Sequence, residues 1–244
     1  MELIEDSFKK VKESKNPEEL NNFLLELGKD PNVKYLNFID YFINTLEPQI
    51  LEKIIINLIF VLGEIGKNVS LDDKYLRFLS NTYYTSDRWI RREIIQAFHK
   101  ISENTTLTNK IIKLVGYALN DDYIPIKIDA QKVLLTLKVL PNKILKNIFH
   151  TLNSKDSEVI NYSSKICEKH FKDTDQLFTS LNESENFRIL KPHGVRALLL
   201  SCFKSLINLE AFRETILNSK WSDTSKKLYL KEIETYESIL LKNI

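Results

Sequence analysis

One spacing of apolar residues runs through nearly the whole chain: they recur at positions i, i+3 or i+4, and i+7. This spacing puts apolar side chains on one face of an α-helix, whereas the sustained alternation of a half-buried strand is almost absent. Proline or small polar residues mark the expected helix starts, because such residues cap or open a first turn. These marks lie at Asn16-Pro17, Asp30-Pro31, Glu47-Pro48, Ser86-Asp87, Asp121-Asp122, Pro141-Asn142, Asp156-Ser157, Thr174-Asp175 and Ser222-Asp223. The sequence therefore predicts an all-α protein of about fourteen helices.

Composition agrees with the all-α class and limits the cellular compartments in which the protein is expected. Only 5 glycines and 6 prolines occur in 244 residues, too few for a turn-rich β-sandwich or barrel. Two cysteines indicate a reducing environment, and the acidic start of the chain is unlike a secretory signal. The longest apolar stretch, residues 54–62, is far shorter than the roughly 20 residues that span a bilayer. We expect a cytoplasmic protein with no membrane insertion.

A longer recurrence joins the predicted helices. Around Ile90, an apolar residue precedes the base Arg91, and core residues follow three and seven positions after that base. The apolar residue at the head of this pattern recurs at intervals of 39, 36, 33 and 36 residues, at Leu51, Ile90, Ile126, Val159 and Val195. A period in this range is typical of stacked helical hairpins that bury their apolar faces against their neighbours.

At this point the chain resembles the HEAT-repeat family. The resemblance rests on the helix end Leu62-Gly63-Glu64-Ile65-Gly66 and on the acid-then-base openings Asp87 to Arg91 and Asp122 to Lys127. It is best over residues 48–170 and weaker over 174–206. It implies one domain over 1–244, a right-handed α-solenoid of about seven stacked antiparallel hairpins, with capping hairpins at about 1–30 and 207–244.

In HEAT arrays the conserved acid and base positions join adjacent repeats, so the resemblance implies a structural role for these residues here. Oriented carboxylate–guanidinium pairs suit such a joint. The residues concerned are Asp87, Arg91, Asp122, Lys127, Asp156 and Arg196. The base is missing at Glu52 and Ile160, which interrupts a continuous ladder of pairs.

Motifs that would carry chemistry are not found in the sequence. The four histidines lie in separate helices or loops, without the spacing of metal ligands or the repeated His-Glu pairs of HEAT-fold iron hydroxylases. There is no glycine-rich phosphate loop and no nucleophile elbow, and Cys167 and Cys202 occupy core positions. We therefore expect no enzyme activity, no metal and no cofactor.

One column of polar residues recurs on the faces opposite the predicted core. On the helix after Asp87 it includes Arg88, Arg92 and Gln96, and stepping Gln96 through the repeat gives polar residues each time. Second helices of HEAT-like hairpins usually line the concave surface, so this column predicts a binding track for a protein segment. The track comprises Asn57, Arg88, Arg92, Gln96, Lys132, Lys165 and Ser201.

The uneven distribution of charge leaves alternative functions open. Residues 1–85 carry a net −4, residues 86–172 a net +6, and residues 173–244 are balanced. The basic middle would suit nucleic acid, with Trp89 nearby, although we expect Trp89 to pack on the preceding repeat. HEAT-like DNA glycosylases and bilin lyases are further alternatives. The favoured prediction is a non-enzymatic scaffold that binds a partner protein segment, with its oligomeric state open.

Overall fold

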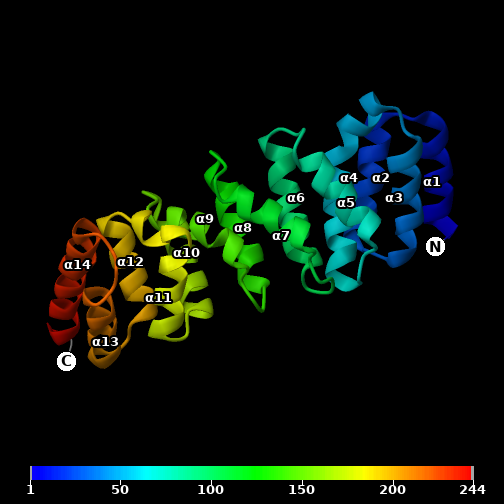
Figure 1. Cartoon of the computed structure of the whole chain (residues 1–244). Helices are drawn as coiled ribbons and strands as arrows, with labels where there is room; N and C mark the ends of the chain where they lie inside the picture. The colour runs from blue at the N-terminus through cyan, green and yellow to red at the C-terminus, as the bar shows by residue number, and fades with distance from the viewer. Residues whose placement is uncertain (1, 243–244) are drawn as a thin grey trace. The chain divides into compact units, whose positions relative to one another are not determined.

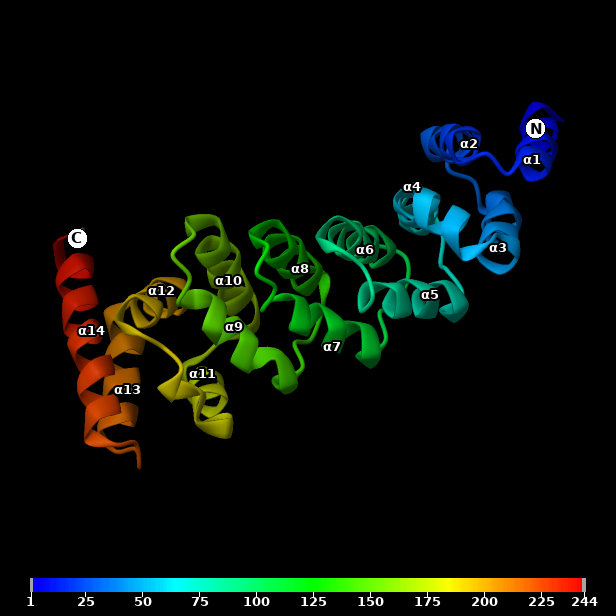
Figure 2. The ribbon, with the colours of Figure 1, turned by 90° about the horizontal axis from the view of Figure 1, so that it is seen from above.

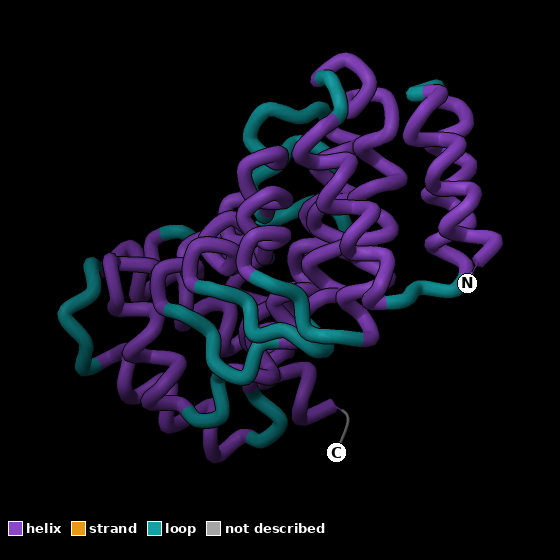
Figure 3. Tube along the Cα trace, turned by 90° about the vertical axis from the view of Figure 1, so that its right-hand side faces the viewer, coloured by secondary structure: helices purple, strands orange, loops and turns teal. Residues whose placement is uncertain are grey.

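The structure is a computed structural model that describes residues 2–242 (Figure 1). Within that range the regular structure is entirely helical, with fourteen α-helices, three short 3-10 helices and no strand (Figure 3). The predicted all-α class is therefore confirmed. None of the described helices combines the length and hydropathy that a bilayer-spanning segment requires.

The chain, expected to form one domain, has its contacts concentrated in two compact units. Unit 1 extends to Leu114 and unit 2 begins at Val115, so the boundary falls within α7. The helices of unit 1 are α1 (Glu2–Ser14), α2 (Pro17–Lys29), η1 (Val33–Tyr35), α3 (Leu36–Thr45), α4 (Pro48–Asn68), α5 (Asp73–Tyr83), α6 (Arg88–Ile101) and the start of α7 (Asn109–Ala118).

Unit 2 continues the same alternation of helices. It holds the end of α7, then α8 (Ile124–Thr136), η2 (Asn142–Ile144), α9 (Leu145–Leu152), α10 (Ser157–His170), α11 (Thr174–Asn182), η3 (Glu183–Arg188), α12 (Pro192–Cys202), α13 (Leu206–Leu217) and α14 (Asp223–Lys242).

Most helix starts lie at the predicted marks, and the capping chemistry explains why. The side chain of Asn16 accepts a hydrogen bond from the amide of Glu18, and Pro17 opens α2. Asp30-Pro31 is an exception, because α3 begins only at Leu36, after the 3-10 turn η1. Asn32 caps that turn by accepting from the amide of Lys34, so the local hydrogen bond starts η1 instead of α3.

In unit 1 the even-numbered helices pack in series, α2 on α4 and α4 on α6, while α1, α3 and α5 each pack on the helix that follows them (Figure 2). The α4–α6 joint is tight at Gly63. A Cβ atom there would lie 3.1 Å from the Cα of Ala97, closer than ordinary van der Waals contact. A side chain at Gly63 would therefore press the two backbones apart, and this favours glycine as one residue of the Leu62–Gly66 helix end.

In unit 2 the series is α8, α10, α12 and α14, and its first joint is polar. Gln131 of α8 donates from Nε2 to the Oγ of Ser163 (2.6 Å) and to the carbonyl of Val159 (3.0 Å) in α10. Ser163 in turn lies 2.7 Å from the Oγ1 of Thr151 in α9. All three polar side chains are buried, so hydrogen bonds fix the register of these helices.

Bonds between neighbouring helices repeat a separation near 36 residues. The amides of Asn21 and Asn57 are 2.7 Å apart in unit 1, and Glu64 pairs with Lys100 at 2.7 Å, each across 36 positions. In unit 2, Asn153 donates to the carbonyl of Ile189 across the same separation. The period deduced from apolar residues is thus also the period of the polar contacts.

Candidate partner-binding surface

The unit 1 part of the predicted track lies on α6. Asp87 accepts hydrogen bonds from the amides of Trp89 and Ile90 at 2.9 and 3.0 Å, and these bonds set where α6 begins. From that start, Arg88, Arg92 and Gln96 follow one another a turn apart, so they share one side of the helix. Arg88 is exposed and the other two are half-buried.

Trp89, which was expected to pack on the preceding repeat, keeps half of its side chain exposed. Its side chain is 50% exposed, and the guanidinium carbon of Arg88 lies 5.1 Å from its ring centroid. The helical phase explains this, because Trp89 precedes the buried Ile94 by five residues and is turned about 140° away from it. Tyr84, in the α5–α6 connection, is 62% exposed. The start of α6 thus presents aromatic and basic groups together.

Asn57, the α4 member of the track, has a structural contact. Its Nδ2 donates to the Oδ1 of Asn21 in α2, and Asn21 donates from Nδ2 to the carbonyl of Lys53. This side chain therefore joins α2 to α4. Its half-buried position leaves only part of it for a partner.

The unit 2 part of the track brings two of the predicted residues together. The Nζ atoms of Lys132 in α8 and Lys165 in α10 lie 5.6 and 5.1 Å from the ring centroid of Tyr162 in α10. Both lysines therefore contact one aromatic ring from adjacent helices. The Nζ of Lys132 also lies 3.3 Å from the buried carboxylate of Asp129, which anchors that lysine to its own helix.

Ser201, the α12 member, is turned inward. Its side chain is buried and its hydroxyl donates to the carbonyl of Ala197 at 2.6 Å, one turn back in the same helix. The neighbouring Leu200 is 54% exposed. At α12 the exposed position therefore lies one residue before the position that the repeat column predicts. The exposed residue there, Leu200, is apolar.

Of the residues expected at joints between repeats, the two acids Asp87 and Asp156 cap their own helices. Asp156 accepts from the amides of Glu158 and Val159 at 3.0 Å, as Asp87 does in α6. Asp122 is exposed, and the preceding Asp121 makes the corresponding bond, to the amide of Tyr123. These carboxylates start helices, which is a local role.

The bases of the same set divide differently. Arg196 of α12 forms an ion pair with the buried Glu232 of α14, with 2.6 Å between its Nε and the Oε2 atom. This pair does join neighbouring helices of the series. Arg91 donates to the carbonyl of Ser86 just before its own helix, and Lys127 is half-buried on α8.

Tyr162 and Leu200 are the surface residues that sequence reasoning missed. Tyr162 lies three residues before Lys165, and that helical spacing was the available signal for a shared face. Leu200 carries no such signal, because an exposed leucine and a core leucine look alike in a sequence of this pattern. Only the drift of the column at α12 identifies it.

The surroundings of the two thiols do not activate them. Burial raises the pKa of the Cys167 thiol well above its ordinary value, and burial raises that of Cys202 to about 12, so both are protonated thiols near neutral pH. Among the residues that the structure describes, no three His, Cys, Asp or Glu side chains are grouped to hold a metal ion.

Comparison with known proteins supports the fold and nothing finer. No family model matches the chain, and no curated protein matches it. A solved structure of an engineered protein from the Northeast Structural Genomics Consortium is similar, with a TM-score of 0.53 and 13% identity over 96% of this chain and 98% of that one. At this identity the likeness concerns the fold alone.

Proposed function

We propose that the chain is a HEAT-like right-handed α-solenoid that acts as a non-enzymatic scaffold and binds an acidic segment of a partner protein. The serial packing of even-numbered helices within each unit and the separation near 36 residues support the solenoid. In such an array these helices line the concave side. The two free cysteines fit a reducing compartment, and we place the protein in the cytoplasm.

The observation that carries the binding proposal is the arrangement of Lys132, Tyr162 and Lys165 in unit 2. The ammonium groups of Lys132 from α8 and Lys165 from α10 lie near one ring, that of Tyr162, and the exposed Leu200 lies on α12, the next helix of the series. A partner carboxylate would pair with the lysines while an apolar side chain packs on the tyrosine and leucine. Because these groups sit on packed helices, little ordering of the scaffold is needed on binding. We name these four residues the lysine–tyrosine face.

The test compares two charge-matched variants of the full chain. In the first, Lys132→Glu, Tyr162→Ala and Lys165→Glu remove the face; in the second, Lys227→Glu and Lys231→Glu change exposed lysines of α14 by the same charge. Quantitative capture of partners from cell extract should lose one protein with the first variant only. Equal capture by both, with unchanged circular dichroism, contradicts the proposal.

A second function, binding of single-stranded nucleic acid, is favoured by the exposure of Trp89. An exposed tryptophan beside Arg88, with Tyr84 nearby, offers base stacking and phosphate contacts together. This combination comes from unit 1 alone and does not depend on the lysine–tyrosine face.

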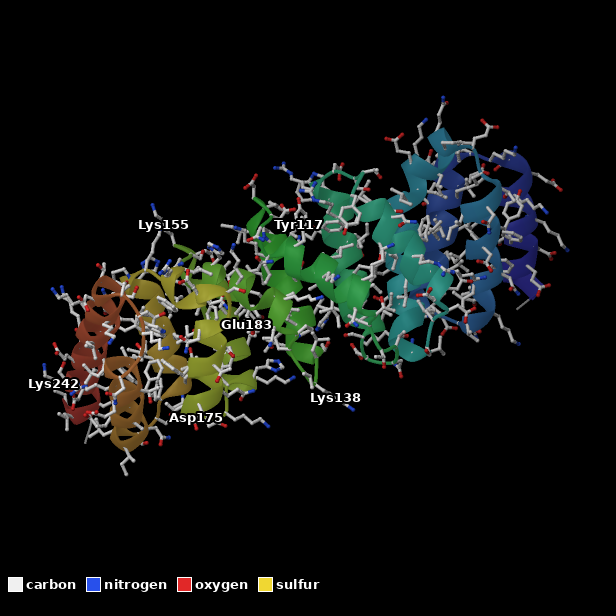
Figure 4. The ribbon with its side chains drawn as sticks, viewed as in Figure 1. Tyr117, Lys138, Lys155, Asp175, Glu183 and Lys242 are labelled. Atoms are coloured by element: carbon white, nitrogen blue, oxygen red, sulfur yellow. The ribbon has the colours of Figure 1, made fainter. Side chains whose placement is uncertain are left out.

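A gel shift with a single-stranded oligonucleotide at low salt tests this second function. Binding should weaken steeply as salt rises and should fall about tenfold in Trp89→Ala, the loss of one stacked base. Tyr117→Ala is the matched control, since Tyr117 is 62% exposed on α7 of unit 2 (Figure 4). Absence of any shift at low salt excludes the function.

A further inference from the structure

Unit 2 contains a cavity that neither proposed function uses. It lies where the chain leaves α8 and where it passes from α10 to α11, and its volume is about 420 Å³. Small-molecule sites in proteins commonly have about 300–1,000 Å³, so this volume suits a small ligand. The lining residues are Lys138, Val139, Leu140, Asn142, Leu145, Lys169, His170, Phe171, Lys172, Gln176 and Ser180.

The ionisable side chains that line the cavity are basic. Three are lysines and one is His170, and no carboxylate occurs among the lining residues. Within the described chain, the side chains of Lys138 and Lys172 have no ion pair with a carboxylate. Lys138 extends outward from the end of α8 (Figure 4). The Nζ of Lys169 donates to the carbonyl of Leu135, which leaves its charge uncompensated.

Acidic residues near the cavity in sequence are engaged elsewhere. Glu168 lies 3.5 Å from Lys204, and the carboxylate of Asp173 accepts from the amide of Gln176 as the cap of α11. Asp175 is exposed on α11 and does not line the cavity. The positive charge inside is therefore not neutralised by the cavity's own walls, which favours an anion.

Two neutral groups add hydrogen-bonding capacity. The Nε2 of His170 is buried without a hydrogen-bond partner among the described residues, a state that costs free energy unless a ligand or water satisfies it. Gln176 accepts from the amide of Lys172 through Oε1, so its side-chain NH₂ can donate elsewhere. Leu140, Leu145 and Phe171 form a buried apolar wall beside these groups.

We propose that this cavity binds a small organic phosphate through Lys138, Lys169 and Lys172, with its organic part against the apolar wall. A phosphate monoester carries nearly two negative charges and three acceptor oxygens at neutral pH, which suits a cavity lined by three lysines better than a single carboxylate does. The apolar wall would receive an organic group that inorganic phosphate lacks. This site is separate from the lysine–tyrosine face and from Trp89.

The test titrates pyrophosphate and phenyl phosphate into the full chain by calorimetry at constant ionic strength. Wild type should bind both saturably, and Lys138→Gln with Lys172→Gln should weaken binding at least about tenfold, since each loses a charge-assisted hydrogen bond. Lys143→Gln with Lys146→Gln is the matched control: both lysines are exposed next to the cavity but do not line it. That control should bind within about twofold of wild type.

Nuclear magnetic resonance of the His170 ring gives a second readout that nonspecific charge would not reproduce. Phenyl phosphate should shift the His170 resonances of wild type and leave those of His193 in place. Non-saturable binding, equal loss in the control variant, or a His170 signal that does not move at saturation overturns the proposal. So does a single-stranded oligonucleotide or acidic peptide that requires Lys138 and Lys172 while the small phosphates do not bind.

Discussion

The two units hold neighbouring helices together by different means. In unit 1 the α4–α6 joint depends on the close approach of Gly63 to Ala97, whereas in unit 2 the α8–α10 joint depends on the buried hydrogen bonds of Gln131 and Ser163. The α4–α6 joint requires a residue without a side chain, whereas the α8–α10 joint requires hydrogen-bond partners for its buried polar atoms. An apolar joint should therefore fail when a side chain is added, and a polar one when a side chain is removed.

The largest effect should come from adding volume to the unit 1 joint. Gly63→Val places a branched side chain where a Cβ alone would already lie 3.1 Å from the Ala97 backbone, and we expect a loss of about 3 kcal/mol in the free energy of unfolding. Chemical denaturation followed by circular dichroism measures it. The control is Lys53→Val on the exposed side of α4, which adds only the cost of valine in a helix. Equal losses for the two would show that the joint is not tight.

The next effect removes the polar link of unit 2. Gln131→Ala deletes both donated bonds to α10 and leaves a gap, so we expect a loss of about 2 kcal/mol. Gln131→Met fills the space but deletes the same two bonds, so its loss should be more than half as large as that of the alanine variant if the bonds hold this joint. A methionine variant nearly as stable as wild type would mean that the filled volume, and not the hydrogen bonds, carries the stability of this joint.

A smaller effect should appear with pH and belong to unit 2, which contains His150 and His170. Burial lowers the pKa of His170 from its ordinary 6.5, with Lys169 and Lys172 adding to the effect and the backbone of Leu134 opposing it, and burial also lowers the pKa of His150. Below pH 6.5 the unfolded chain then binds more protons than the folded one, so this stability is complete above pH 6.5 and is lost as pH falls through the lowered values.

Melting temperatures at about pH 7.5 and about pH 5 measure this dependence. The fall for wild type should exceed the fall for the variant with His150→Gln and His170→Gln together. A variant with the same fall would assign the pH dependence to other groups.

The smallest effect concerns the lysine–tyrosine face. Lys165→Gln removes one contact with the ring of Tyr162 on the surface, and we expect a loss of about 0.5 kcal/mol or less. A loss above about 2 kcal/mol would make this face part of the core, and the binding proposal would then fail.

The sequence was sufficient for features that depend on local chemistry. The caps Asn16, Asp87 and Asp156 predicted three helix starts because each bonds amides of the turn that follows it. It was less informative at Asp30-Pro31, where Asn32 provides a competing cap for a 3-10 turn. Local hydrogen bonds decide where the helix begins in all of these cases. Only the Asp30-Pro31 segment offers two caps close together, and the sequence does not show which of them is used.

The candidate surface was harder to predict because it depends on register between helices. At α12 the exposed position is shifted by one residue relative to the repeat column, so Ser201 is turned inward and Leu200 outward. The sequence of a single helix does not show such a shift. The cavity lysines were also missed, although residues 130–155 contain five lysines and no acid. The sequence shows this excess of lysines, which includes Lys138. Lys169 and Lys172 come from the end of another helix, and only the fold brings them to the same cavity as Lys138.

The separation near 36 residues has a consequence for how the protein is made. A bond such as that between Asn21 and Asn57 can form once the second partner has left the ribosome, with no need for the far end of the chain. Because domains fold as units during synthesis, a newly completed helix of either unit can dock at once on the preceding helix of its own series. Within each unit, assembly can therefore keep pace with translation, because its contacts join segments that are close in sequence.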